Sequence, residues 1–120
     1  MILVDTSVWI DHLHAPDARL SARLEADDVG CHQLVIEELA LGSIANRAEV
    51  LALLANLTRF PEVGHREILH ITDRRRLWGR GLSAVDVHLM AAVALVAGAK
   101  LWTRDKRLGR VAAECGVTLF

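Results

Sequence analysis

The sequence predicts an α/β fold in which a short parallel β-sheet is covered by helices on both faces. Short apolar runs rich in β-branched residues alternate along the chain with longer helical segments, and strands separated by helices usually pair in parallel. The chain has 120 residues, of which 52% are hydrophobic and 24% charged. This length and balance suit one compact domain with a buried core. We therefore expect a single domain over residues 1–120.

The first half of the chain opens with a buried strand. Met1–Asp5 is a short apolar run, and the Thr6-Ser7 pair that follows is typical of a helix start. Val8, Trp9 and Leu13 suit a short helix that ends before Pro16. Leucines at i, i+4 spacing predict a second helix. This helix is expected over residues 17–27. The other elements expected in this half are a strand over 29–31 and helices over 34–41 and 49–57.

The second half is expected to alternate in the same way. Glu67–Gly79 reads as a charged helix with a narrow apolar face, whereas Val85–Ala97 is almost wholly apolar and predicts a helix in the core. Lys100–Thr103 carries the next strand. The other predicted elements are an extended segment 60–63, a helix 106–115 and a final strand 117–120.

Membrane and export signals are weak in this sequence. No apolar run approaches the ~18–20 residues that span a bilayer. The start of the chain lacks the basic segment of a signal peptide. Cys31 and Cys115 form neither a CxxC motif nor a zinc spacing, so we expect reduced thiols in a cytoplasmic protein.

Charge is unevenly distributed, although the net charge is only −1. Residues 1–60 hold nine acids and four bases, net −5, and residues 61–120 hold six acids and ten bases, net +4. This pattern allows an acidic site beside a basic surface. Twelve of the fourteen bases are arginines. Arginine suits bidentate contact with phosphate, and codon bias is the competing explanation.

Several acids occupy positions that favour a shared site. Asp5 ends the first strand and Asp105 follows the strand 100–103, and parallel sheets bind ligands at the carboxyl ends of their strands. An aspartate there can also serve only as a helix cap. Asp86 stands in a capping-box spacing after Ser83, at the start of the apolar helix.

Two adjacent glutamates, Glu37 and Glu38, lie in the apolar helix 34–41. Apolar residues nearly encircle this helix, so periodicity does not choose between them. One of them beside the three aspartates would give a set of oxygen ligands for a hard cation such as Mg²⁺ or Mn²⁺. Carboxylates this close repel one another and need a cation to neutralise them.

Four ordered segments resemble the motifs of PIN domains of the VapC toxin type. They are Val4–Ile10, Glu38–Gly42 with its E-L-x-x-G pattern, Gly81–Leu89 and Leu101–Leu108. Each motif is short, but all four occur in the family's order, and the resemblance covers the whole chain. The resemblance implies a three-layer α/β/α sandwich and a metal-dependent ribonuclease that acts as the toxin of a toxin–antitoxin pair.

The resemblance also implies roles for particular residues. The metal-binding and catalytic acids would be Asp5, Glu38, Asp86 and Asp105, holding Mg²⁺ or Mn²⁺, with polar helpers at Thr6, Ser7 and Thr103. We expect RNA to be held by Arg104, Lys106, Arg107 and Arg110, with a second basic patch at Arg74, Arg75, Arg76 and Arg80 whose competing role is a solvated helix face. The expected partners are an RNA substrate, a cognate antitoxin whose arginine could neutralise the acids, and a second copy of the chain, since the helices over 34–42 and 46–57 leave apolar surface uncovered.

Three alternatives remain at this stage. A PIN-like domain could serve only to bind RNA or protein, although all four acids are present. A phosphohydrolase on a similar sheet would need a second aspartate after the first strand, where Asp5-Thr6-Ser7 has none. Histidine-driven cleavage through the 2′-hydroxyl is the third, and of the six histidines only His88 is expected near the acids.

Overall fold

The computed structural model describes residues 1–120 and contains one parallel sheet of four strands. The central strand β1 (Ile2–Val4) lies between β2 (Val29–Cys31) and β4 (Lys100–Trp102), and β3 (Thr58–Arg59) pairs with the outer edge of β2. All pairings are parallel, so the four strands end on the same side of the molecule.

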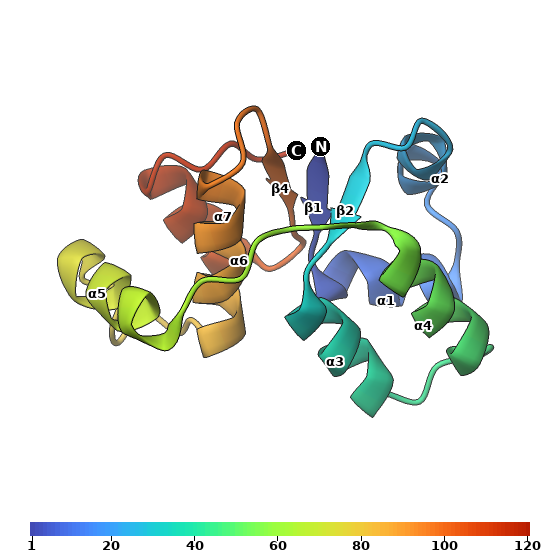
Figure 1. Ribbon diagram of the computed structural model, residues 1–120, viewed down its shortest axis with the longest axis horizontal. Coiled ribbons are helices and arrows are strands. Elements are labelled where there is room, and N and C mark those ends of the chain that lie inside the picture. The colour runs from blue at the N-terminus through green and yellow to red at the C-terminus, as the bar shows by residue number, and fades with distance from the viewer.

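Helices cover both faces of this sheet, as the sequence predicts. Figure 1 shows the helices of the first half on one side of the strands and those of the second half on the other. The first group comprises α1 (Thr6–His14), α2 (Ala18–Glu25), α3 (Gln33–Leu41) and α4 (Arg47–Asn56). The second group comprises α5 (His65–Arg75), α6 (Ala84–Ala94) and α7 (Lys106–Glu114). The expected three-layer α/β/α arrangement is confirmed.

The core is one cluster of 28 buried residues centred on the strands. Leu3, Val4 and Leu101 are completely buried. Gly30 in β2 is required by packing, because a Cβ atom there would lie 2.5 Å from the ring of Phe60. The missing side chain lets Phe60 close the core at the edge of the sheet.

Element boundaries differ from the prediction by more than two residues at four places. The outer strand is Thr58–Arg59 rather than the extended segment 60–63, because α4 ends at Asn56 and the chain pairs at once with β2. Helix α5 stops at Arg75, since Arg76 has a left-handed backbone with φ of 54°. Helix α6 ends three residues early at Ala94, and the final strand is reduced to one bridge between Leu119 and Leu101.

Both cysteines are free thiols, as expected. Cys31 is buried at the end of β2, and burial raises its pKa to about 11. No helix is both long enough and apolar enough to cross a membrane.

Candidate functional site

Asp5 is the best-anchored acid at the carboxyl end of the sheet. It follows β1, is 7% exposed and caps α1, where its Oδ1 accepts a hydrogen bond from the Thr6 amide at 2.7 Å. Its Oδ2 accepts from Thr103 Oγ1 at 2.6 Å and from Ser7 Oγ at 3.0 Å. Two hydroxyl groups from different parts of the chain therefore fix the orientation of this carboxylate.

Thr103 links Asp5 to Asp105. The Thr103 hydroxyl donates to Asp5 and accepts from the Asp105 amide at 3.0 Å. Asp105 caps α7, with its Oδ1 accepting from the amides of Arg107 and Leu108 at 2.9 and 3.3 Å. The cap uses one carboxylate oxygen and leaves Oδ2 without a hydrogen bond inside the protein.

Asp86 carries the electrostatic signature of the site. It forms the predicted capping box: its Oδ2 accepts from the Ser83 amide at 2.9 Å, and its own amide donates to Ser83 Oγ at 3.2 Å. Burial raises the pKa of Asp86 above its ordinary value, and the negative charges of Asp5 and Asp105 raise it further. Asp5 and Asp105 therefore lie close enough to Asp86 to disfavour the charged form of its carboxyl group.

Glu38 joins this group from α3. Its Oε1 accepts a hydrogen bond from Thr6 Oγ1 at 2.6 Å, which ties α3 to the first turn of α1 beside Asp5. Both glutamates are exposed, but Glu37 forms no such contact. The structure therefore distinguishes two glutamates that periodicity left equivalent.

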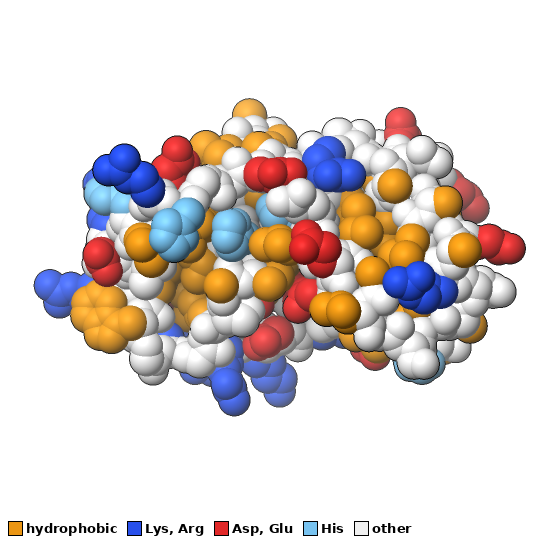
Figure 2. Space-filling view, turned by 60° about the horizontal axis from the view of Figure 1, so that its bottom comes forward, with side chains coloured by type: hydrophobic (Ala, Val, Ile, Leu, Met, Phe, Trp, Pro, Cys, Tyr) orange, Lys and Arg blue, Asp and Glu red, His pale blue; other side chains and the backbone are white.

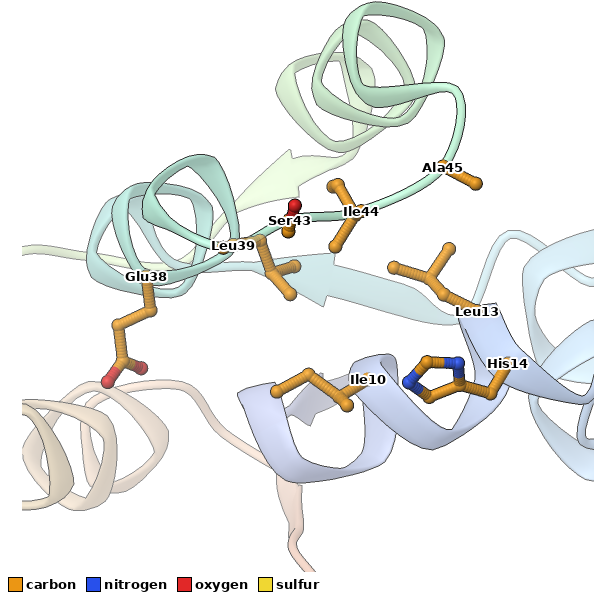
Figure 3. Close-up of a pocket in the computed structure, with 9 residues that line it drawn as sticks. Ile10, Leu13, His14, Glu38, Leu39, Ser43, Ile44 and Ala45 are labelled. Atoms are coloured by element: carbon orange, nitrogen blue, oxygen red, sulfur yellow. The ribbon is translucent and has the colours of Figure 1, made fainter.

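An apolar hollow of about 350 Å³ opens beside Glu38, between α1, α3 and the loop that follows α3. Figure 3 shows Ile10 and Leu13 of α1 facing Leu39 and Ile44, with Glu38 at the edge. Ile10 is 42% exposed. The site thus has an acidic end and an adjoining apolar surface.

The acids form a loose arrangement rather than a closed cage. No group of three Asp, Glu, His or Cys side chains converges closely enough to hold a metal ion. Nevertheless, the available donors are carboxylate and hydroxyl oxygens, which suit Mg²⁺ or Mn²⁺, and Mg²⁺ usually keeps several waters and needs only one or two carboxylates. Burial and the nearby charges of Asp5 and Asp105 raise the pKa of Asp86, and a bound cation would offset both effects. The residues present fit a divalent cation.

The basic residues expected to hold RNA fall into two groups. Arg104 is engaged inside the protein, since its guanidinium pairs with Asp11 and, at 2.8 Å, with Asp17. Lys106, Arg107 and Arg110 are exposed along α7. Of the second patch, Arg74, Arg75 and Arg76 lie exposed at the end of α5, and Arg80 pairs with Glu114 at 2.8 Å.

The expectation that only His88 lies near the acids needs correction. His32 directly follows β2, and its ring centroid is 6.2 Å from that of His88. Its Nδ1 accepts from the Leu34 amide at 3.0 Å, so it caps α3, an uncommon role that the sequence pattern did not suggest. Burial and the neighbouring His88 lower the pKa of His32, so it is neutral at pH 7.

Figure 2 looks toward the end of the molecule at which the strands finish. Acidic side chains (red) lie near the middle of this face, with histidines (pale blue) in a row beside them. Both chain termini lie at the end of the sheet where β1 begins, opposite the end at which the strands finish (Figure 1).

Comparison with known proteins agrees with this geometry. The PIN domain family model matches residues 2–114. Ribonuclease VapC32 from two strains of Mycobacterium tuberculosis, CDC 1551 / Oshkosh and ATCC 25618 / H37Rv, is 66% identical over 119 residues. The match covers 99% of this chain and 96% of each relative.

Solved structures show the same fold. The structure of FitAB bound to an IR36 DNA fragment aligns over 100% of this chain and 94% of that chain, with a TM-score of 0.65 and 24% identity. PAE2754 from Pyrobaculum aerophilum aligns over 92% of this chain and 78% of that chain, with a TM-score of 0.57 and 23% identity. By the family model and the close relatives, the chain belongs to the PIN-domain family and, within it, to the VapC-type ribonucleases.

Proposed function

We propose that residues 1–120 form one PIN-like domain that acts as a metal-dependent endoribonuclease, the toxin of a toxin–antitoxin pair. The observation that carries this proposal is the half-buried Asp86 carboxylate, which has the charges of Asp5 and Asp105 beside it. A buried carboxylate with like charges beside it is typical of a functional site rather than of a helix cap alone. The 66% identity to proteins named ribonuclease supports the activity.

The acids divide into two roles in this proposal. Asp5 and Asp86 are the principal ligands of Mg²⁺ or Mn²⁺, because they are the more buried and are held by hydrogen bonds to neighbouring groups. Glu38 and Asp105 are more exposed and contribute directly or through water. A bound divalent cation supplies charge stabilisation at the scissile phosphate and makes water a competent nucleophile at neutral pH.

The surrounding hydroxyl groups keep the acids in place. Thr103 and Ser7 orient Asp5 Oδ2, and Thr6 holds Glu38 Oε1 toward the same end of the sheet. Asp105 Oδ2 has no hydrogen bond within the protein and can accept one from the attacking water. Hydrolysis of this kind leaves a 5′-phosphate and a 3′-hydroxyl.

The proposed protein partner is an antitoxin that covers the apolar hollow and reaches the acids. Ile10 and Leu13 on α1 face Leu39 across the hollow, with Glu38 at its edge (Figure 3). An antitoxin arginine could pair with the carboxylates there. Ile10→Glu should weaken binding of the product of an adjacent antitoxin reading frame while leaving RNA cleavage near wild type, whereas equal antitoxin binding would exclude this hollow.

We also propose that the chain forms a homodimer. Leu41 and Leu53, on α3 and α4, are 90% and 48% exposed, which is costly for large apolar side chains in so small a domain. Light scattering at tens of micromolar protein should give twice the chain mass. A monomer at that concentration would reject the dimer.

The experiment that tests the activity is cleavage of a labelled single-stranded RNA with Mg²⁺ or Mn²⁺. EDTA should abolish cleavage, and a single 2′-deoxy substitution at the cut should leave it largely intact. A substrate that resists cleavage when deoxy-substituted, together with a 2′,3′-cyclic phosphate product, would overturn the metal mechanism and direct attention to His88 and His32. Absence of cleavage on any RNA, with the protein folded, would favour a binding module.

A further inference from the structure

Three arginines from segments far apart in the sequence surround one hollow on the side of the molecule that carries Asp86 and Asp105. The hollow measures about 260 Å³ and is lined by Arg80, Arg107 and Arg110, with Gly79 and Val111. Arg80 belongs to the loop before α6, and the other two lie three residues apart on α7, so they project from neighbouring positions of one helix face.

The charge of this hollow is only partly compensated. Arg80 pairs with Glu114 at 2.8 Å, and neither Arg107 nor Arg110 forms an ion pair. Three guanidinium groups around one space, with a single carboxylate, repel one another unless an anion lies between them. Guanidinium groups match phosphate oxygens in geometry as well as in charge.

A glycine in the loop before α6 leaves room for the side chain of Arg107. Gly81 has a positive φ of 78°, and a Cβ atom there would lie 2.8 Å from Arg107 Nη1. Glycine therefore allows both the turn and the close approach of Arg107. The same loop leads two residues later to Ser83, which caps the helix that carries Asp86.

Two arginines of the hollow follow Asp105 closely in the chain. Asp105 Oδ1 accepts the hydrogen bond of the Arg107 amide at 2.9 Å, so Arg107 stands in the first turn of α7 directly after that acid. The two segments that carry Asp86 and Asp105 therefore also carry the arginines. A strand whose phosphate lies at the acids can place another phosphate at the arginines.

Resting on the proposed ribonuclease function, we propose that Arg80, Arg107 and Arg110 form a phosphate-binding site for the backbone of single-stranded RNA, next to the cleavage site. The site combines Arg80 from one predicted basic patch with Arg107 and Arg110 from the other. These two patches are separate in the sequence. It does not use Arg104, whose charge is satisfied by Asp11 and Asp17.

The test measures binding of a short fluorescein-labelled RNA by anisotropy, with EDTA present so that no cleavage occurs. The double variant Arg107→Gln/Arg110→Gln should bind at least about tenfold more weakly, and the slope of log K against log salt should fall by about 1–2. Arg66→Gln removes an exposed arginine of α5 outside the hollow and is the matched control. Equal binding by wild type and the double variant would overturn the proposal.

A second variant acts in the opposite direction. Glu114→Gln removes the carboxylate that competes for Arg80, and it should tighten RNA binding by a few-fold. Damage to the fold would not tighten binding, so this gain separates a phosphate site from a structural role. Unchanged or weaker binding by Glu114→Gln counts against the proposal.

Two further arms identify the contact and separate this proposal from the function on which it rests. Single-stranded DNA of the same sequence should show the same loss of salt slope in the double variant, since the contact is to phosphate; a loss confined to RNA would point to the 2′-hydroxyl and overturn the site as proposed. If wild type cleaves RNA with Mg²⁺ but the double variant binds and cleaves normally, only this inference fails. If wild type never cleaves while the double variant still loses binding, the ribonuclease function fails and the phosphate site stands.

Discussion

Residues 1–60 contribute the helices on one side of the sheet and residues 61–120 those on the other, with net charges of −5 and +4 (Figure 1). In the first half, Arg19 and Arg23 pair with nearby aspartates. In the second half, most basic side chains have no carboxylate partner. Arg104 is an exception, because it crosses to acids of the first half.

This difference explains how a nearly neutral protein can hold both an acidic site and a basic surface. Each half supplies two of the four proposed catalytic acids. Asp5, Asp86 and Asp105 stand at strand or helix ends, and Glu38 reaches Thr6 beside Asp5 from within α3. Two of the unpaired arginines of the second half, Arg107 and Arg110, lie just after Asp105 on α7, where they can meet a phosphate chain rather than neutralise the acids. The net charge therefore does not indicate which ligand the protein binds. The charged side chains without an ion-pair partner are the better indicator.

The largest expected effect comes from removing one acid from either half. Asp5→Asn and Asp86→Asn should each reduce RNA cleavage by more than about 100-fold. Losing a residue that only supports a metal ligand costs about 10–100-fold, and losing a ligand itself should cost more. Asparagine keeps the volume and the cap acceptor, so circular dichroism should remain that of wild type. Asp27→Asn, an exposed acid with φ of 55° that asparagine tolerates, is the control. Full activity in either variant would mean that the site does not need both halves.

A smaller effect separates the two glutamates of α3. Glu38→Gln should reduce cleavage by about 10–100-fold, because it removes the negative charge of the carboxylate that accepts the Thr6 hydrogen bond. Glu37→Gln should cleave like wild type, since the Glu37 side chain forms no hydrogen bond or ion pair within the protein. If Glu37→Gln loses cleavage in the same kinetic assay and Glu38→Gln does not, Glu37 is the glutamate of the site.

The third effect concerns pH and the stability of the metal-free protein. The pKa of Asp86 is raised in the folded state, so the stability it contributes is fully present at low pH and is lost as pH rises through that folded pKa. Urea unfolding in EDTA should therefore find Asp86→Asn more stable than wild type at pH 7, with the difference shrinking toward about pH 4.

Adding Mg²⁺ should reduce the difference in the free energy of unfolding between Asp86→Asn and wild type at pH 7, because a cation that binds only the folded wild type stabilises it. An Asp86→Asn variant that is less stable than wild type at pH 7 in EDTA would show that Asp86 serves mainly as a cap. In that case the repulsion from Asp5 and Asp105 would be too weak to matter.

The smallest effect is expected at the ion pairs that join the two halves, between Arg104 and the acids Asp11 and Asp17. Arg104→Ala should lower the free energy of unfolding by less than about 1 kcal/mol, since the ion pairs with Asp11 and Asp17 are partly exposed. RNA affinity should stay within twofold of wild type by anisotropy. A loss as large as that of the Arg107→Gln/Arg110→Gln variant would return Arg104 to the RNA-binding surface.

Much of the fold follows from local sequence pattern. The strands around Leu3 and Leu101 and the apolar helix around Leu89 were predicted because each is a continuous apolar run whose length distinguishes strand from helix. The aspartates that follow strands, and the capping box at Ser83 and Asp86, are local patterns too. The sequence by itself thus determined the order of elements and placed three candidate acids at their ends.

Tertiary structure decided the features that depend on contacts between distant segments. The pairing of Thr58 and Arg59 with β2 requires Phe60 to pack over Gly30, which no local pattern encodes. The choice of Glu38 depends on Thr6, 32 residues away. Whether an arginine is free or paired likewise depends on which segment lies opposite, so Arg104 and Arg107 look alike in the sequence and differ in the fold. Hydrophobic pattern and capping act over a few residues, whereas charge and hydrogen-bond partners are fixed only when the chain brings separate segments together.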